Sequence, residues 1–198
     1  MTGCASILLA AGGSSRLGKM KQLLQIDGES LLRRTARFAA EAGCSPNIVV
    51  LGASVEALRP ELDALDVEVV INADWPKGMG SSLGVAMNSL MQRSLVPAAA
   101  LLLVCDQPNV DAELMRTIIA QQIAAETAIV ASRYAGVVGV PAVFASTFFP
   151  ELAAIQGDRG ARHILLQHSA QTSYVDFPRG SFDVDTPADE LLLKQSRL

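Results

Sequence analysis

The chain has 198 residues, half of them hydrophobic, and a formal net charge of −4 at pH 7. This length favours one domain over residues 1–198, and the acidic balance argues against a general nucleic-acid surface, which needs clustered Lys and Arg. No apolar run approaches the roughly 18 residues that span a bilayer, and residues 1–4 lack the basic segment of a secretory signal. We therefore expect a cytoplasmic protein with neither nucleic-acid nor membrane partners.

Apolar runs of β type alternate with stretches of helical periodicity, which is typical of parallel strands joined by crossover helices. The sequence predicts strands at 5–9, 47–51, 67–72, 98–105, 128–131 and 173–176. Between and after them it predicts helices at 30–42, 55–65 (interrupted by Pro60), 78 to about 93, 110–124, 148–154, 161–167 and 187–193. A hairpin of 134–138 and 142–144 follows the strand at 128–131. The expected fold class is therefore α/β and Rossmann-like. It has a mostly parallel central sheet flanked by helices, and the hairpin is a small insertion.

The first predicted strand ends in a loop of small residues that is followed by three cations. The small residues are Ala10, Ala11, Gly12 and Gly13, and the cations are Arg16, Lys19 and Lys21. Glycines allow a close approach of the backbone, and successive amides with nearby cations bind anions. The stretch predicts a phosphate cradle, although an ordinary strand-to-helix turn would use the same residues.

Two familiar phosphate motifs do not fit this loop. A Walker loop would place a magnesium-binding hydroxyl directly after Lys19, where this chain has Met20. The dinucleotide fingerprint Gly-x-Gly-x-x-Gly is also absent, because Gly12, Gly13 and Gly18 have the wrong intervals. A dinucleotide-dependent oxidoreductase is therefore a remote alternative.

Carboxylates follow the apolar run at 98–105 and recur near the C-terminus. Asp106 comes directly after that run, and Pro108 prevents the strand from continuing. A carboxylate there is a natural Mg²⁺ ligand or, equally, a turn or cap residue. Asp183 and Asp185 lie on one side of an extended segment, so either can join Asp106 at a cation while the other caps the last helix.

Two further segments carry candidate binding residues. Gly80, Ser81 and Ser82 open a predicted helix, where they either bring amides and hydroxyls to a base or phosphate or simply cap the helix. Asp158 and Arg162 belong to a charged loop that either holds an anionic substrate or is a solvated turn. Together with the glycine loop and the carboxylates, these residues fit metal-assisted phosphoryl or nucleotidyl transfer, in which positioning and charge stabilisation dominate.

The motifs together resemble the molybdenum cofactor cytidylyltransferases, a group of MocA/MobA-like nucleotidyltransferases. The segments that carry the resemblance are 9–12, 16–24, 78–83, 105–108, 139–144, 157–162 and 183–187, in the family's order. The first two are shared with the nucleotide-sugar nucleotidyltransferases, whereas the later ones are more specific. The resemblance covers nearly the whole chain and implies a nucleotidyltransferase fold.

The resemblance implies transfer of a nucleotide from CTP to the terminal phosphate of molybdopterin, with release of pyrophosphate and with Mg²⁺ as cofactor. It implies catalytic and triphosphate-neutralising roles for Arg16 and Lys21, a catalytic role for Asp106, and Mg²⁺ ligation by Asp106 and Asp185. The implied nucleotide contacts are Ala10, Ala11, Gly12, Gly13, Gly80, Ser81 and Ser82. The implied acceptor contacts are Gly139, Pro141, Asp158 and Arg162. Transient contact with molybdoenzymes or their chaperones would follow from this role.

Several alternatives stay open. Guanylyltransferase relatives usually carry Gly where this chain has Ala11, which favours CTP, and GTP is the alternative. Cytidylyl transfer to a sugar phosphate or to methylerythritol phosphate is a rival within the same class. A non-catalytic chaperone that holds the cofactor is a rival from another class.

Overall fold

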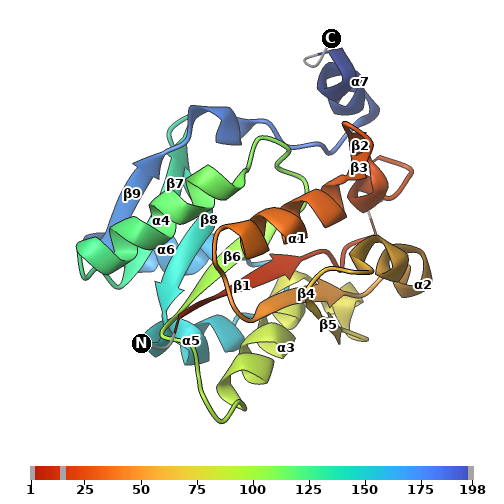
Figure 1. Cartoon of the computed structure of the whole chain (residues 1–198). Coiled ribbons are helices and arrows are strands. Elements are labelled where there is room, and N and C mark those ends of the chain that lie inside the picture. The colour runs from red at the N-terminus through yellow and green to blue at the C-terminus, as the bar shows by residue number, and fades with distance from the viewer. Residues whose placement is uncertain (1–2, 14–16, 196–198) are drawn as a thin grey trace.

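A seven-stranded sheet with helices on both faces forms the centre of the computed structural model, which describes residues 3–13 and 17–195 (Figure 1). The strands are β1 (Cys4–Leu9), β2 (Gln25–Ile26), β3 (Glu29–Ser30), β4 (Asn47–Leu51), β5 (Glu68–Ile71), β6 (Ala99–Val104), β7 (Ile129–Tyr134), β8 (Val137–Ala145) and β9 (Thr172–Asp176). The α-helices are α1 (Leu31–Glu41), α2 (Val55–Leu58), α3 (Met79–Met91), α4 (Ala112–Ala124), α5 (Phe149–Ala153), α6 (Arg162–Gln167) and α7 (Pro187–Gln195).

The order of strands in the sheet is β5-β4-β1-β6-β8-β7-β9. The first four run parallel, and Leu9 of β1 pairs with Val50 of β4 and with Val104 of β6. The carboxyl ends of these three strands are therefore level with one another. This brings the loop after β1 and the segment after β6 to the same edge of the sheet, where α/β proteins bind their ligands.

The predicted hairpin of 134–138 and 142–144 is wrong, because residues 137–145 form the single strand β8. The hairpin in the structure joins β7 to β8 through a turn at 135–136, and both of its strands belong to the central sheet. β8 is antiparallel to β6 on one side and to β7 on the other. The register shifts so that Ala142 pairs with Ala131 and Gly139 with Ser132, which leaves Val140 and Pro141 between them as a bulge. A bulge accepts a proline because it needs no ladder N–H there, so a residue that looked like the end of a strand lies inside one.

Helix ends follow the sequence at α1 and α4 and differ at α3. Ser30 caps α1 by accepting a hydrogen bond from Arg33 N, and Asp111 caps α4 by accepting one from Leu114 N. The predicted serine caps of α3 are wrong, because the cap position is Gly78. Its φ of 101° is one that side-chain-bearing residues rarely adopt.

The second helix differs from its prediction, whereas the last helix begins as predicted. The predicted helix at 55–65 is α2 followed by a 3₁₀ turn over Arg59–Leu62, since Pro60 cannot donate the hydrogen bond that would continue the helix. The last helix starts at Pro187, as predicted. Among the described residues, no helix is long and apolar enough to cross a membrane.

Each face of the sheet buries its own apolar layer. On one face, Ile7 packs in a cluster with Leu83 of α3, and on the other, Leu8 packs in a cluster with Leu32 of α1; all four are at most 1% exposed. Burying such a side chain contributes about 1.5–3 kcal/mol. The strands at the centre are continuously apolar because both of their faces are covered.

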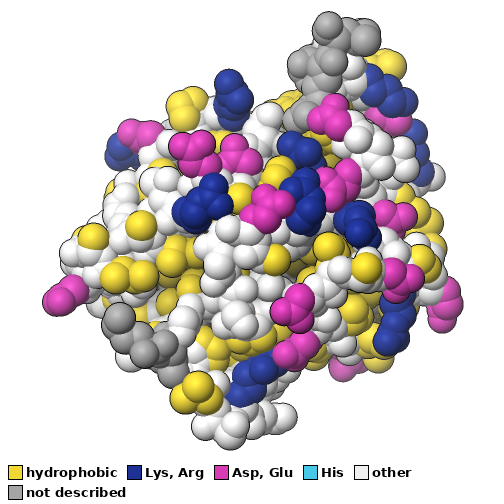
Figure 2. All heavy atoms as spheres, in the orientation of Figure 1, with side chains coloured by type: hydrophobic (Ala, Val, Ile, Leu, Met, Phe, Trp, Pro, Cys, Tyr) yellow, Lys and Arg dark blue, Asp and Glu magenta, His cyan; other side chains and the backbone are white. Residues whose placement is uncertain are grey.

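The solvent side of α1 and α4 carries basic and acidic side chains interspersed with one another (Figure 2). Arg37 of α1 pairs with Glu29 of β3 at 2.7 Å and with Glu41 at 2.5 Å. The first of these pairs ties the small β2–β3 hairpin to α1 beside the carboxyl edge of the sheet.

Candidate active site

A lysine between two aspartates marks the carboxyl edge of the sheet. Lys21 Nζ lies 2.5 Å from Asp106 Oδ2 and 3.1 Å from Asp185 Oδ1. Asp106 follows β6, and the segment that carries Asp185 is held beside it by a hydrogen bond of 2.9 Å from Val184 N to Asp106 O. Three segments far apart in the chain therefore meet at one charged point, as the strand-end positions predict.

The ammonium of Lys21 stays charged at this point. Burial alone would lower the pKa of Lys21, but the charge of Asp106, the hydrogen bond to it and the contact with Asp185 raise the pKa above its usual value. The two carboxylates thus already share one positive charge. They have the ligand chemistry for a divalent cation, since Mg²⁺ is commonly held by one or two carboxylates with the remaining oxygens supplied by phosphates and water.

In the described part of the chain, no group of three or more His, Cys, Asp or Glu side chains is arranged to hold a metal. A metal at Asp106 and Asp185 would therefore need oxygens from a bound substrate. The third nearby carboxylate, Asp183, lines a different cavity. Burial and the charge of Asp106 raise the pKa of Asp183 to about 6.

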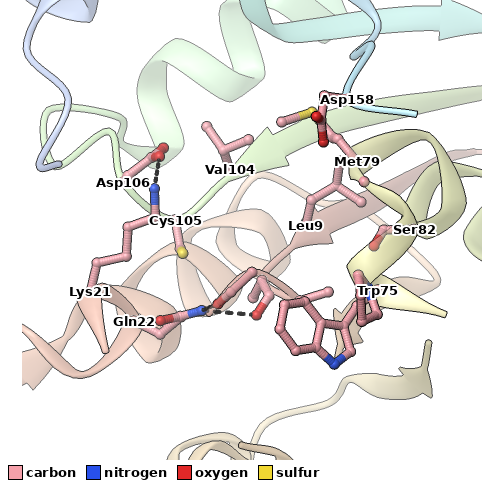
Figure 3. A pocket seen from close by; sticks show the side chains of 15 residues that line it. Leu9, Lys21, Gln22, Trp75, Met79, Ser82, Val104, Cys105, Asp106 and Asp158 are labelled. Atoms are coloured by element: carbon pink, nitrogen blue, oxygen red, sulfur yellow. Dashed lines mark hydrogen bonds and ion pairs between the residues drawn. The ribbon is translucent and has the colours of Figure 1, made fainter. Parts of the chain in front are cut away.

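The charged point opens into a first cavity of about 390 Å³ (Figure 3). It is lined by Leu9, Ala10, Ala11, Gly12, Lys21, Gln22, Trp75, Pro76, Gly78, Met79, Ser82, Val104, Cys105, Asp106 and Asp158. Seven of these were predicted site residues, and the structure brings them together around one space. Their contacts with a nucleotide stay a prediction.

Gln22 shapes the loop that walls this cavity, and sequence reasoning assigned it no role. Its Nε2 donates hydrogen bonds to Ala10 O at 3.0 Å and to Gly12 O at 2.7 Å, and the residue is 1% exposed. One buried amide thus fixes two carbonyls of the loop and turns the backbone between them. The signals in the sequence were its place directly after Lys21 and its membership of the segment 16–24 that carries the family resemblance.

Some predicted nucleotide residues support the cavity without lining it. Arg16 lies outside the described residues. Gly80 is buried and donates its N–H to Gly157 O at 2.9 Å; a Cβ there would come within 2.6 Å of Ile155 O. Ser81 Oγ donates to Gly78 O at 2.8 Å, within the first turn of α3. Gly80 therefore holds α3 against the loop at 155–157, Ser81 closes the first turn of α3, and Ser82 lines the cavity.

Gly13, the last of the predicted small residues, also does not line the cavity. A Cβ on Gly13 would lie 3.5 Å from the Trp75 ring, so this glycine packs against the indole. Its neighbours at 10–12 form the wall. The loop therefore has one side on the cavity and one on Trp75.

A second cavity of about 500 Å³ lies beside the first, and Leu9, Met79 and Val104 belong to the walls of both. Two of the predicted acceptor residues, Gly139 and Arg162, line it. The other two lie elsewhere. Asp158 lines the first cavity, and Pro141 is buried in the β8 bulge with its carbonyl accepting a hydrogen bond of 2.7 Å from Ser132 Oγ. The second cavity is mostly apolar, with Arg162 and Asp183 as its charged groups.

Solved structures with the same fold include relatives that are 30–35% identical. Rv0371c of Mycobacterium tuberculosis H37Rv is 35% identical, with 98% of this chain and 99% of that one covered and a TM-score of 0.78. A structure of Rv0371c in complex with manganese is 33% identical, with 98% and 100% covered and a TM-score of 0.75.

Curated relatives match in part or in full. Nicotine blue oxidoreductase of Paenarthrobacter nicotinovorans is 39% identical over 77 residues, which is 38% of this chain and 38% of that protein. The chain thus spans little more than a third of that relative's length in the match. The purine catabolism protein PucB of Bacillus subtilis is 26% identical over 96% of this chain and 95% of PucB.

The family model described as the MobA-like NTP transferase domain matches residues 6–172. That span contains the loop after β1, Lys21, Asp106 and most of both cavities. The chain belongs to the MobA-like NTP transferase family and is a nucleotidyltransferase.

Proposed function

We propose that this protein transfers a cytidylyl group from CTP to the terminal phosphate of a molybdopterin-type cofactor, with Mg²⁺, in the cytoplasm. The observation that carries the proposal is the convergence of Lys21, Asp106 and Asp185 at one end of the first cavity, which shares a wall with the second. The family supplies the reaction class. The first cavity is the place for the nucleoside triphosphate and the second for the acceptor.

The charged groups have different roles at the triphosphate. Lys21 neutralises phosphate oxygens, and the backbone at 10–12 offers the close approach that small residues permit. Asp106 and Asp185 would hold the Mg²⁺, which supplies Lewis-acid stabilisation of charge on the phosphates. A structure of the relative Rv0371c is a complex with manganese, which supports a divalent metal in this protein.

The reaction balances without a nucleophile from the protein. An oxygen of the acceptor phosphate forms a bond to the α-phosphorus, the bond from that phosphorus to the bridging β-oxygen breaks, and pyrophosphate leaves with the electron pair. Lys21, held in place by two carboxylates, stabilises the charge that moves onto the leaving group. Positioning the two substrates in adjoining cavities supplies the remainder of the catalysis.

The choice of substrates rests on particular residues. Ala11 lines the first cavity at the position where guanylyltransferase relatives usually have Gly, and this supports CTP. The motif segments that resemble molybdenum cofactor enzymes contribute Gly139 and Arg162 to the second cavity, which supports a phosphorylated pterin as acceptor. The mostly apolar wall suits a planar ring, and Arg162 suits its phosphate.

The test is a screen of CTP, GTP, ATP and UTP for pyrophosphate release with Mg²⁺ and molybdopterin. We expect release with CTP alone. Release with GTP would replace the proposal by guanylyl transfer, and turnover only with a sugar phosphate or methylerythritol phosphate would replace the acceptor. Tight cofactor binding without CTP binding in calorimetry would indicate a chaperone.

The assigned site is tested by a pair of matched substitutions. Asp106→Asn removes the charge that pairs with Lys21, and we expect kcat/KM to fall by at least about 100-fold, or ~2.7 kcal/mol of transition-state stabilisation. Asp111→Asn makes the same change at the α4 cap, where Asn also caps, and should leave kcat/KM unchanged. Full turnover by Asp106→Asn would remove this carboxylate from the mechanism.

A further inference from the structure

The end of the first cavity away from the charged point carries an aromatic ring. Trp75 and Met79 lie at that end, with Asp158 beside Met79, whereas Lys21 and Asp106 lie at the other (Figure 3). Trp75 is the single tryptophan of the chain. The cavity therefore has the ion pair of Lys21 and Asp106 at one end and a large π surface at the other.

The backbone around Trp75 is held by a buried asparagine. Asn72 is 1% exposed, its carbonyl accepts a hydrogen bond from Trp75 N at 3.4 Å, and its Oδ1 accepts one from Asp74 N at 3.0 Å. Its Nδ2 donates to Ser82 Oγ at 3.0 Å, which links this turn to α3. Trp75 therefore starts from a fixed turn, so its indole has a defined position beside the cavity.

Glycines on both sides make room for the indole. A Cβ on Gly52 would come within 2.6 Å of Trp75 Cβ and 2.9 Å of Ala11 Cβ, which no side chain tolerates. A Cβ on Gly13 would touch the far edge of the ring, 3.5 Å from Cη2. The ring thus lies along the loop at 11–13, on the segment that also walls the nucleotide cavity.

We propose that Trp75 is the stacking platform for the base of the nucleoside triphosphate. The inference rests on the proposed placement of the triphosphate at Lys21 and Asp106, because that placement leaves the base at the aromatic end. Stacking on an aromatic ring uses the π face that every base has, so it supplies affinity without choosing among bases. Trp75 therefore strengthens CTP and GTP binding alike, and groups at the base edge set the preference.

The single tryptophan makes the wild-type protein its own reporter. We expect CTP and GTP, added with Mg²⁺ and without acceptor, to quench the intrinsic fluorescence and to protect it from acrylamide. Tripolyphosphate, which has the phosphates but no base, should bind without either effect. Calorimetry on the same samples gives the Kd for each ligand independently of the fluorescence.

Three variants separate the effect of losing the aromatic ring from the effect of changing side-chain volume at this position. In calorimetry, Trp75→Leu should raise the Kd for CTP and for GTP by about 5- to 150-fold, the range for loss of one stacked base. Its Kd for tripolyphosphate should match that of the wild type. Trp75→Phe keeps a ring and should recover most of the loss, and Gly52→Ala, which displaces the indole, should weaken nucleotide binding while Trp75 itself is retained.

The outcomes distinguish a failure of the stacking role of Trp75 from a failure of the proposed function. Normal CTP binding by Trp75→Leu, with no quenching of the wild type, overturns the platform and leaves the nucleotide site intact. No binding heat for any nucleotide in the wild type overturns both. Circular dichroism and the thermal midpoint report folding of each variant, and the wild-type quenching and Trp75→Phe results decide the question even where Trp75→Leu does not fold.

Discussion

Replacing Gln22 with leucine removes two hydrogen bonds at nearly constant volume. The bonds from its Nε2 to Ala10 O and Gly12 O are 3.0 and 2.7 Å long, and the side chain is 1% exposed. Each such bond contributes about 0.5–1.5 kcal/mol net, and a buried carbonyl left without a donor costs about 1–3 kcal/mol. Ala10 is 2% exposed, so its carbonyl bears that cost, whereas Gly12 is exposed and regains water. We expect a loss of about 2–3 kcal/mol in the free energy of unfolding.

The same substitution should act on the nucleotide more than on the chemical step. Because the two carbonyls fix the backbone that walls the first cavity, Gln22→Leu should raise the KM for CTP by at least about 10-fold, with a smaller change in kcat. Urea unfolding gives the stability, and steady-state pyrophosphate release gives the two kinetic constants. An unchanged KM together with the expected loss of stability would show that Gln22 serves the fold alone.

Gln22→Glu is the matched control, because it keeps the shape and changes the donor. A carboxylate would face two carbonyls, and only the protonated acid can donate to one of them. Burial raises the pKa of such a carboxyl, so the variant's deficit in unfolding free energy should be smallest at about pH 5 and grow as the pH rises to about 8. The deficit of Gln22→Leu should stay flat over this range. Wild-type stability of Gln22→Glu at the upper end of the range would refute the role given to the two bonds.

Three further outcomes follow from other contacts. Lys21→Met should abolish turnover yet tighten Mn²⁺ binding to the nucleotide-free protein, because the ammonium no longer shares Asp106 and Asp185; weaker Mn²⁺ binding in calorimetry would contradict this. Glu29→Gln should cost up to about 1 kcal/mol of unfolding free energy at neutral pH. Since Arg37 holds the pKa of Glu29 below its usual value, the difference in unfolding free energy should shrink as the pH falls through the ordinary range of a glutamate carboxyl and vanish once Glu29 is protonated in the folded protein as well. Urea unfolding measures it, and a constant difference would count against the pair. Asp111→Ala should cost about 1 kcal/mol through the lost α4 cap, with an unchanged KM for CTP.

Elements with strong local signals were predictable from the sequence. The run at 98–105 is too apolar for anything but a strand covered on both faces, and the end of that strand puts Asp106 at the edge of the sheet. Ser30 and Asp111 stand at the caps that their hydrogen-bonding side chains favour. The meeting of Lys21 with Asp106 and Asp185 was also predictable, because each follows an element that ends at the same edge.

Features that depend on tertiary contacts were not predictable. Gly139 and Pro141 indicate turns by their local preferences, yet β8 runs through both because its neighbours β6 and β7 supply the pairing and a bulge absorbs the proline. Gly80 packs against Ile155, a contact that its place in a predicted binding segment does not indicate. The position of Trp75 does not follow from any hydrophobic periodicity in its own segment. The indole fits where it does because Gly52, at the end of another strand, has no side chain there.

Because the two cavities share part of their walls, sequence changes that fit one cavity to a new ligand also affect the other. Leu9, Met79 and Val104 each touch both spaces, so enlarging any of them narrows both at once. Ala11 borders only the first cavity and Val138 only the second. A lineage that exchanges one substrate while keeping the other can therefore accept substitutions at positions that border one cavity alone, such as Ala11 or Val138. The three shared side chains stay constrained by whichever ligand is retained.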